Sequence, residues 1–487
     1  MQAEEVLIQR FIWSFILLLI LVRPTIAPAQ TKLELISGTD ITTQLQRAIN
    51  SCAYFCSLAL PPGSFFIQDI TIKKEGTLRI VGAGKEATVL TYIGTGTAIT
   101  LIPQSGRIPI AFEDFKMVAL KPGANGMKLA FFEPATIRNF WMTGFTGNIW
   151  LTGDGQDQSV GAWIDNARIE NIAGEGAYAI SMDHVADVYI DSMQAYTAID
   201  DKFAQSIIID RGAQGIYLNH VVSIGGKNNF VLRSTGQGGD YGIEPSAIHC
   251  SSSYFDSATG GSAVVFDSTL GTNEMRTMFS NCWAGGAGHK SSEFSSISEP
   301  QAHGVLIEGG KDIQWNGGVI RQNSGDGVHI SGSLPLEVIQ IHGARILANN
   351  AGDSPVGAGI RVTNPNVSHL SILGNTIGNI VEGKGHQKYG ISFPNGYHPT
   401  TKIMNNTVDV NEVKNFDGVP SCLGCQPEQV RFSELEPAPN GTQLFCTDCG
   451  VAQPQSCVNA RTEAACRCVG NGSGAFAKRL NSTWLCY

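Results

Sequence analysis

Between residues 65 and 415, short runs of alternating apolar and polar residues follow one another, separated by Gly, Asn and Asp. This pattern is typical of β-strands joined by tight turns. Four runs share one form and begin at Gly304 (GVLI), Gly327 (GVHI), Gly359 (GIRV) and Gly390 (GISF), at spacings of 23, 32 and 31 residues. A repeat this short cannot enclose a core by itself, so the pattern predicts coils stacked into a solenoid.

A second element follows each run in phase: IQWNGGVI, IQIHGARI, SILGNTI and KIMNNTV. An asparagine comes within a few residues of each, at Asn323, Asn349, Asn379 and Asn411. Parallel pairing between successive coils would stack these asparagines, and their amide groups would form a hydrogen-bonded ladder. The longer coils would carry loops inserted on one face. We therefore predict an all-β parallel β-helix over residues 65–418.

The segment before the solenoid, residues 30–64, predicts a strand and a capping helix. A strand is expected at Leu33–Ile36. DITTQLQRAINSC, from Asp40 to Cys52, has helical spacing of apolar residues and Asp40 as a plausible N-cap. A helix here would cover the open edge of the first coil.

Three N-terminal segments, DITTQLQRAINSC, LALPPGSFFI and LRIVGAGKEATVL, resemble the start of the pectate-lyase-like right-handed parallel β-helix superfamily. That group includes rhamnogalacturonase-like and epimerase-like enzymes and tailspike depolymerases. The resemblance covers roughly residues 35–415. It implies a right-handed solenoid and an exported protein that acts on or binds polysaccharide, but it does not define the chemistry.

The extreme N-terminus reads as an export signal. Phe11 to Val22 are twelve almost unbroken apolar residues, and Ala27-Pro28-Ala29 fits a cleavage site. We expect residues 1–29 to be a signal peptide and the protein to be secreted or extracytoplasmic, with no other membrane contact. Glu4 and Glu5 leave an uncleaved anchor as the alternative.

The chain has 12 cysteines, eight of which lie between Cys422 and Cys486. They predict a disulfide-rich module over residues 419–487. The pairs Cys422-x-x-Cys425 and Cys446-x-x-Cys449 also match the spacing of a zinc ribbon, which is the alternative.

The remaining cysteines form two pairs. Cys52 and Cys56 are close enough in sequence for a local bridge. Cys250 and Cys282 are 32 residues apart, so they are expected to meet on adjacent coils.

Charge narrows the range of partners. The formal net charge is −9 and charged residues are 15% of the chain, which gives no general attraction to nucleic acid. An acidic polysaccharide would need a local basic groove or a bridging Ca²⁺ ion.

The stretch AIDDKF places Asp200 and Asp201 side by side. Paired carboxylates can serve glycoside hydrolysis, one as general acid and the other activating water. Adjacent strand residues point to opposite faces, so both would serve only at a bend. They are also common turn residues. The N-T-D, G-H-G and R-I-K motifs of polygalacturonases are missing at matching distances, so that assignment is disfavoured.

A lyase instead needs a base and a cation that neutralises a uronate carboxylate. Further catalytic candidates therefore lie in the same coils: His220, Arg233, Asp240 and Tyr241. Two glycine- and serine-rich insertions, Ser234 to Pro245 and Ala284 to Gln301, would project as loops and could wall a groove.

Trp141, Trp150 and Trp163 flank a polar loop and are candidate sugar-stacking residues if exposed, or core residues if buried. Together these features predict a carbohydrate-active enzyme that cleaves an acidic polysaccharide by β-elimination or hydrolysis, in a groove around residues 183–245. The alternative is a non-catalytic, glycan-binding or adhesin-like surface protein. Self-association into a homo-oligomer is left open.

Overall fold

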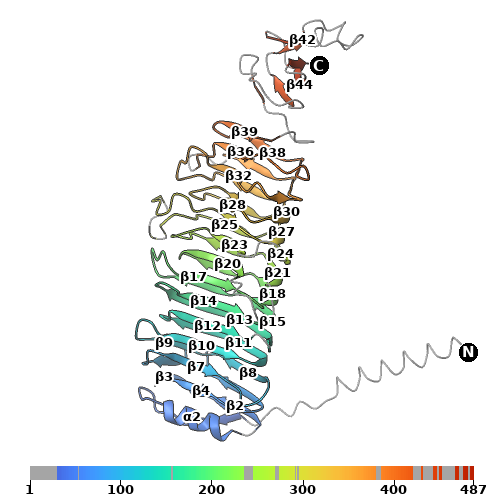
Figure 1. Ribbon diagram of the computed structural model, residues 1–487. Coiled ribbons are helices and arrows are strands. Elements are labelled where there is room, and N and C mark those ends of the chain that lie inside the picture. The colour runs from blue at the N-terminus through green and yellow to red at the C-terminus, as the bar shows by residue number, and fades with distance from the viewer. Residues whose placement is uncertain are drawn as a thin grey trace, which may run out of the picture.

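The computed structural model describes residues 30–52, 54–154, 157–234, 245–268, 274–290, 292, 295–379, 385–419, 429–430, 443–446, 449–451, 467–470, 475–480 and 483–486. The proposed signal peptide, Asp240 and Tyr241 lie outside these residues. Within them the chain winds into a right-handed parallel β-helix, drawn as a tall stack of coils in Figure 1. The predicted all-β, right-handed parallel β-helix is confirmed.

Each typical coil contributes two strands to a 26-stranded sheet, here called sheet A, and one strand to a 13-stranded sheet, sheet B. All pairings between successive coils in both sheets are parallel, for example Val305↔Val328 and His329↔Arg361 in sheet B. Residues far apart in sequence but one coil apart in space therefore lie about 4.8 Å from each other.

Sheet B is built from the third strand of each coil. Its strands are β4 (Ile70–Ile72), β7 (Thr97–Leu101), β10 (Asn125–Ala130), β12 (Gly147–Thr152), β14 (Tyr178–Asp183), β17 (Gln205–Ile209), β20 (Asn228–Ser234), β23 (Val264–Ser268), β26 (Val305–Ile307), β29 (Val328–Ile330), β32 (Ala358–Val362), β36 (Tyr389–Ser392) and β39 (Lys414–Asp417).

Sheet A bends at one corner of every coil, and its strands lie on both sides of that corner. The first side holds β1 (Gln30–Lys32), β2 (Phe55–Ala59), β5 (Thr77–Val81), β8 (Ile108–Glu113), β15 (Val185–Asp191), β18 (Gln214–Asn219), β21 (Ser246–Ser251), β24 (Glu274–Ser280), β27 (Lys311–Asn316), β30 (Leu336–His342), β33 (Val367–Ser368), β34 (Ser371–Leu373) and β37 (Lys402–Met404). The second side holds β3 (Gly63–Ile67), β6 (Thr88–Tyr92), β9 (Lys116–Ala119), β16 (Gln194–Thr197), β19 (Val222–Ile224), β22 (Tyr254–Asp256), β25 (Trp283–Gly285), β28 (Val319–Arg321), β31 (Arg345–Leu347), β35 (Thr376–Gly378) and β38 (Thr407–Asp409), while β11 (Phe132–Thr143) and β13 (Ser159–Ile172) run through the corner.

A single left-handed residue turns the chain at this corner of sheet A. In eleven successive coils one residue there has φ between 47° and 70°, a conformation that glycine and asparagine adopt most readily. The residues are Asp114, Asn139, Asn166, Ser192, His220, Ser252, Asn281, Gly317, Gly343, Gly374 and Asn405. The left-handed conformation therefore explains why asparagine and glycine are frequent at this corner.

Inward positions form stacks of apolar side chains along the solenoid axis. In β6, Thr88, Leu90 and Tyr92 are buried while the residues between them are not. Five aromatic side chains form one internal cluster: Phe230, Phe255, Phe266, Phe279 and Trp315. Because strand side chains alternate with period two, the same alternation in the sequence predicted which residues face inward.

The predicted amide ladder exists, with one change of member. Asn323 Nδ2 donates to Asn349 Oδ1 (2.9 Å), Asn349 Nδ2 to Gln387 Oε1 (3.4 Å), and Gln387 Nε2 to Asn411 Oδ1 (2.8 Å). The prediction that Asn379 is the third member of this ladder is wrong. Its side-chain amide instead bonds the backbone of Gln387, whose longer side chain fills the ladder.

Replacing Asn349 by alanine should lower the free energy of unfolding by about 2 kcal/mol, because the fully buried amides of Asn323 and Gln387 would each lose a partner. The midpoint of urea unfolding measures this change. Thr407→Ala, at an exposed strand position, is the control and should change stability by less than about 0.5 kcal/mol. Equal effects of the two substitutions would contradict a stabilising ladder.

A helix precedes the first complete coil, as expected, but its first residues differ from the prediction. Helix α2 (Thr42–Ser51) lies at the blue end of the stack in Figure 1 and buries Leu45 and Ile49. The N-cap is Ile41 rather than Asp40, because Asp40 forms a β-bridge with Phe66 and the helix begins later. The strand expected at Leu33–Ile36 is instead β1, three residues earlier.

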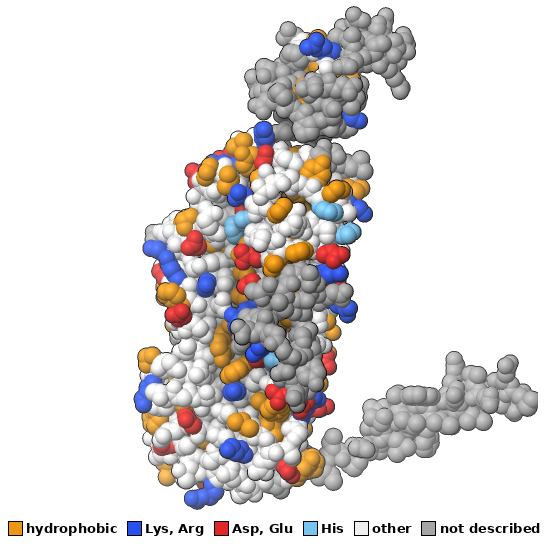
Figure 2. Space-filling view, viewed as in Figure 1, with side chains coloured by type: hydrophobic (Ala, Val, Ile, Leu, Met, Phe, Trp, Pro, Cys, Tyr) orange, Lys and Arg blue, Asp and Glu red, His pale blue; other side chains and the backbone are white. Residues whose placement is uncertain are grey.

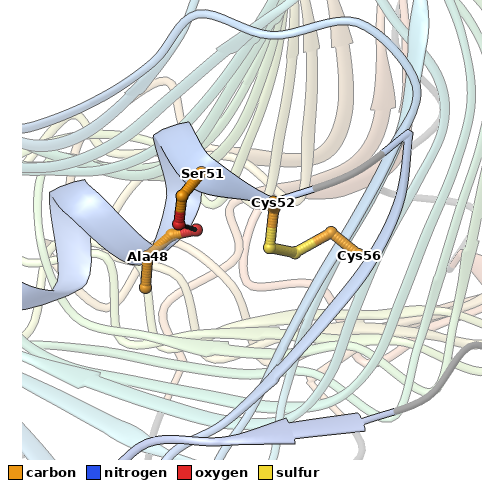
Figure 3. The surroundings of a disulfide bond; sticks show 4 residues. All are labelled: Ala48, Ser51, Cys52 and Cys56. Carbon is orange, nitrogen blue, oxygen red and sulfur yellow. Dashed lines mark hydrogen bonds between the residues drawn. A yellow bond between two sulfur atoms is a disulfide. The ribbon is translucent and has the colours of Figure 1, made fainter.

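Two of the cysteine predictions are confirmed within the solenoid. Cys52 at the end of α2 and Cys56 in β2 form a disulfide with a Cα–Cα distance of 5.5 Å (Figure 3). Cys250 and Cys282 are buried and meet on adjacent coils, with their Sγ atoms 3.3 Å apart.

The C-terminal cysteines contain two further disulfides among the described residues, Cys446–Cys449 and Cys468–Cys486. They accompany short strands: β40 (Gln429–Val430), β41 (Gln443–Cys446), β42 (Gly450–Val451), β43 (Cys468–Val469), β44 (Ala475–Leu480) and β45 (Thr483–Cys486). A disulfide at Cys446–Cys449 favours the stapled module over the zinc ribbon. Cys422 and Cys425 lie outside the described residues.

Most of the face shown in Figure 2 is white, which means uncharged polar side chains and backbone, with single charges scattered over it. This agrees with the low charged content of the chain. Among the residues described, no helix is long and apolar enough to cross a membrane.

Candidate active site

The predicted site residues lie at three different edges of the solenoid. Asp200 and Asp201 precede strand β17 of sheet B, Arg233 lies near the end of β20, and His220 sits at the left-handed corner of sheet A. The register sets Arg233 one residue beyond the Ile209↔Leu232 pair, so the length of β17 separates it from the two aspartates. The structure does not bring these four residues together.

Asp200 and Asp201 make the contacts of turn residues. Asp201 Oδ1 accepts hydrogen bonds from the backbone of Phe203 (2.9 Å) and Ala204 (2.7 Å), and Oδ2 accepts one from Gly174 (2.9 Å). Asp200 has φ = 56° and accepts hydrogen bonds from the backbone and the hydroxyl of Ser292. The pair therefore fixes a turn and the inserted loop beside it. Catalysis by either aspartate stays a prediction.

Arg233 and His220 already have acidic partners. Arg233 Nε donates to Asp210 Oδ2 at 2.8 Å, and its neighbour in register on the next coil is Asp267. His220 Nδ1 lies 3.3 Å from Asp191 Oδ1 on an exposed surface. A guanidinium paired with a carboxylate is less available to a carboxylate of a substrate.

A different group of titratable side chains gathers on three successive coils of sheet B. His303 precedes β26, Asp326 precedes β29, and His329 lies within β29. Arg361 on β32 is the neighbour of His329 in register, and Thr363 follows two residues later. The repeat places equivalent residues of successive coils next to each other. His329 pairs in register with Leu306 on the coil before and with Arg361 on the coil after.

The hydrogen bonds from Asp326 through His303 to His329 all have the same donor-to-acceptor direction. The backbone N–H of Asp326 donates to His303 Nδ1 (2.9 Å), so a neutral His303 carries its proton on Nε2. That Nε2 lies 3.0 Å from His329 Nδ1, which must then be the acceptor. His329 consequently carries its own proton on Nε2, which lies 3.0 Å from Thr363 Oγ1. The backbone thus sets the tautomer of both rings.

Asp326 lies beneath the histidines, with a side chain only 2% exposed. Its Oδ1 accepts a hydrogen bond from the backbone of Ala358 (2.7 Å), and its Oδ2 lies 3.3 Å from His329 Nδ1. Burial raises the pKa of Asp326 to about 7. Burial also lowers the pKa of His329 to about 4 and the pKa of His303 well below its usual range. Near neutral pH the imidazoles are uncharged while the carboxyl group exchanges a proton.

Two histidines and an aspartate are also a common donor set for zinc or iron, and the three ligand atoms lie within 4.8 Å of one another. The tautomers argue against a cation. His303 Nδ1 already accepts the N–H of Asp326, and its Nε2 carries a proton, so neither nitrogen offers a free lone pair. A nearby guanidinium, Arg361, disfavours a cation further. These residues do not fit a metal site.

Arg361 has no hydrogen bond or ion pair to another described residue, and its Nε is buried without a partner. A buried guanidinium donor without an acceptor costs free energy unless a ligand satisfies it. The group lies about one coil spacing from His329. A guanidinium is a suitable partner for a carboxylate, so Arg361 is a candidate contact for an anion beside the imidazole.

The cluster should make stability depend on pH in two directions. Between pH 4 and 6.5 the unfolded chain binds protons that His329 and His303 do not bind when folded, so stability should rise with pH there. The raised pKa of Asp326 acts oppositely: its contribution is lost as pH rises through about 7. Unfolding midpoints against pH should show a maximum near 6.5 that Asp326→Asn shifts upward. An unshifted maximum would contradict this ionisation scheme.

The aromatic residues singled out in the sequence have mostly structural contacts. Trp141 Nε1 donates to Glu170 and Trp150 Nε1 to Asp183, and a lysine lies over each ring. Trp163 is 45% exposed and begins a ladder of parallel rings on sheet A that continues through Tyr189, Tyr217 and His249. These rings stack on one another, so they present mainly their edges to solvent.

No protein-family model and no curated protein sequence matches the chain. Several solved structures share its fold. The pre-mature gene product 12 of bacteriophage phi29 aligns with a TM-score of 0.56 at 14% identity, over 83% of this chain and 57% of that one. Tailspike protein 3 (TSP3) of bacteriophage CBA120 aligns with a TM-score of 0.51 at 14% identity, over 88% and 69%.

The catalytic domain of Agl-KA aligns with a TM-score of 0.51 at 15% identity, over 83% of this chain and 69% of that chain. Identities this low show a common fold and no more. The expected right-handed parallel β-helix fold is confirmed at that level.

Proposed function

We propose that the protein is a carbohydrate-active enzyme that cleaves an acidic polysaccharide on the outer face of sheet B, at Arg361 and His329. The observation that carries this proposal is the guanidinium of Arg361, whose buried Nε has no partner beside a neutral imidazole that presents an N–H group. Perturbed titratable groups of this kind gather at functional sites.

The two residues have complementary roles. Arg361 would bind the carboxylate of a uronate and neutralise its charge, which makes the adjacent C–H bond more acidic. In β-elimination the proton of that bond would pass to solvent water as the glycosidic C–O bond breaks. The Nε2–H of His329 would donate to Thr363 Oγ1 and orient its hydroxyl toward the leaving glycosidic oxygen, and solvent water would supply the proton that this oxygen takes up. Protonation of that oxygen is required in β-elimination and in hydrolysis alike. A bridging Ca²⁺ ion stays part of the proposal, as do export from the cytoplasm and self-association.

A dual assay of the purified protein tests the proposal, with uronate and neutral polysaccharides, with and without Ca²⁺. One measurement follows the ultraviolet absorbance of unsaturated ends, and the other follows new reducing ends. Both signals rising on a uronate polymer is the expected result. Reducing ends alone would indicate hydrolysis and direct attention back to Asp200 and Asp201.

The second candidate function is glycan binding without catalysis. The observation that favours it is burial: the His329 side chain is only 15% exposed and Asp326 is covered. A cluster so enclosed can serve stability alone. Silence in both assay channels, together with retention on an immobilised uronate polymer, would establish this alternative.

A further inference from the structure

Two buried thiols meet beside the left-handed corner of sheet A on successive coils. Cys250 lies in β21, two residues before the corner residue Ser252, and Cys282 directly follows the corner residue Asn281 of the next coil. Each cysteine is 1% exposed, and the two Sγ atoms lie 3.3 Å apart. We infer that this pair is a site of covalent modification: in protein that folds under oxidising conditions, Cys250 and Cys282 are joined by a disulfide that links the two coils. The inference does not depend on the proposed function.

The small size of Cys250 is unusual for its place in the core. Its neighbours in register are Leu218 on the coil before and Phe279 on the coil after. They belong to one inward stack that runs without a break from β8 to β37, and every other member is phenylalanine, isoleucine, leucine or tryptophan. Protein cores are closely packed, so a side chain as small as cysteine leaves room in such a stack. The Sγ atom of Cys282 reaches Cys250 at this point.

The two sulfur atoms are already close to bonding distance. A disulfide has an S–S distance of about 2.0 Å, so the atoms would approach each other by about 1.3 Å, a change on the scale of side-chain rotation. Cys282 Sγ also lies 3.5 Å from the backbone carbonyls of Cys250 and Ser280, but a thiol is only a weak donor to such groups. These contacts do not hold the thiol away from its neighbour.

Other cysteines of the chain show that it is suited to oxidation. Three cysteine pairs among the described residues are disulfides, and one of them, Cys52–Cys56, belongs to the solenoid. Disulfides of this kind form and persist in oxidising compartments. The conditions that close Cys52–Cys56 would also oxidise the pair of Cys250 and Cys282.

The bond would form by exchange with an oxidising disulfide carrier, such as oxidised glutathione. One cysteine thiolate attacks the carrier, which forms a mixed disulfide and releases one carrier thiol. The second cysteine attacks the mixed disulfide, which closes the Cys250–Cys282 bond and releases the other carrier thiol. Two electrons pass to the carrier, and the two cysteine protons end on its two sulfur atoms. Because both cysteines are buried in the finished stack, the exchange takes place before these coils close.

The bridge would strengthen the solenoid where its long insertion begins. Cys282 immediately precedes β25, from which the insertion Ala284 to Gln301 leaves the coil. Ser292 of this insertion donates a backbone hydrogen bond to Asp200, several coils away. A covalent link at Cys282 would therefore hold the base of the insertion to the coil before it.

Peptide mapping of the unaltered protein tests the inference. Trypsin places the two cysteines on separate peptides, 234–276 and 277–290, and neither contains another cysteine. The full chain, produced through a secretory pathway, is unfolded in acid with a maleimide to trap free thiols and digested without reductant. The expected result is one species that contains both peptides and separates on reduction.

Peptide 48–73 carries both Cys52 and Cys56 and is the internal control, because its bridge shows that the preparation was oxidised. Maleimide on both Cys250 and Cys282 in a sample with a closed Cys52–Cys56 bridge would overturn the inference. Linkage of either cysteine to a different one would also overturn it. Neither outcome depends on whether the protein cleaves a polysaccharide.

Unfolding in urea measures what the bridge contributes. The bridge closes a 32-residue loop, so a reductant should lower the urea midpoint of the unaltered protein on the order of 1 M. Cys250→Ala lacks the bridge and should lose most of this shift. Cys52→Ala removes a bridge between residues only four apart and is the matched control, which should keep most of the shift. Equal shifts in the unaltered protein and C250A would contradict a link between the coils, and the peptide map decides should C250A fail to fold.

Discussion

Arg361→Ala is expected to lower kcat/KM on a uronate polymer on the order of 100-fold or more. The guanidinium would form charge-assisted hydrogen bonds with the carboxylate, each worth about 1.5–3 kcal/mol, and two such bonds give an effect of this size. Its Nε is already buried and unpartnered, so binding has no existing ion pair to break. The loss should appear on uronate polymers and not on neutral ones.

Two variants serve as controls for this result. Arg361→Lys keeps the charge but not the planar fork, so part of the activity should remain. Arg345→Ala removes an exposed arginine on sheet A and should have no effect. If the protein binds without cleaving, the same comparison can be made on Kd. Indistinguishable values for R361A and R345A would refute a role for Arg361 in carboxylate recognition.

Phe279→Ala should lower the free energy of unfolding by about 3–5 kcal/mol. Phe279 is fully buried and its ring packs against Phe230 (5.2 Å between centroids), Phe266 (5.6 Å) and Trp315 (5.2 Å). These partners come from successive coils, so the cavity would weaken several interfaces between coils at once. Urea unfolding followed by circular dichroism measures the effect.

An exposed phenylalanine provides the comparison. Phe203 is 62% exposed, and Phe203→Ala should cost less than about 1 kcal/mol. A Phe279→Ala protein as stable as Phe203→Ala would mean that the aromatic cluster does not hold the coils together.

The sequence was sufficient for the architecture because the signals are local and repeated. Alternation with period two marks inward residues, and the runs from Gly304 to Gly390 mark parallel strands of one sheet. Spacing alone also anticipated the contact of Cys250 with Cys282. The replacement of Asn379 by Gln387 in the ladder was not accessible in this way, because the length of the loop between them sets the register.

The candidate site was missed for a related reason. Asp200 and Asp201 attract attention because they are adjacent in sequence, yet adjacency within a turn gives backbone contacts. His303, Asp326 and Arg361 are neighbours only across coils, at sequence separations of a coil each. Aligning the repeated runs would have revealed His329 and Arg361 at one outward position. His220 was chosen as a catalyst, whereas its conformation marks it as a corner residue.

The connection at the left-handed corner of sheet A has a fixed length, whereas the connections at the other corners of the coils vary in length. From β15 onward two residues always join the strands on either side of this corner, as between Asn219 and Val222 or between His342 and Arg345. The other corners range from short turns to the stretch between Gly285 and Val305. New loops can therefore be acquired, or grafted by design, beside sheet B without shifting any strand. Surfaces that bind other molecules can change there while the paired strands of the solenoid keep their register.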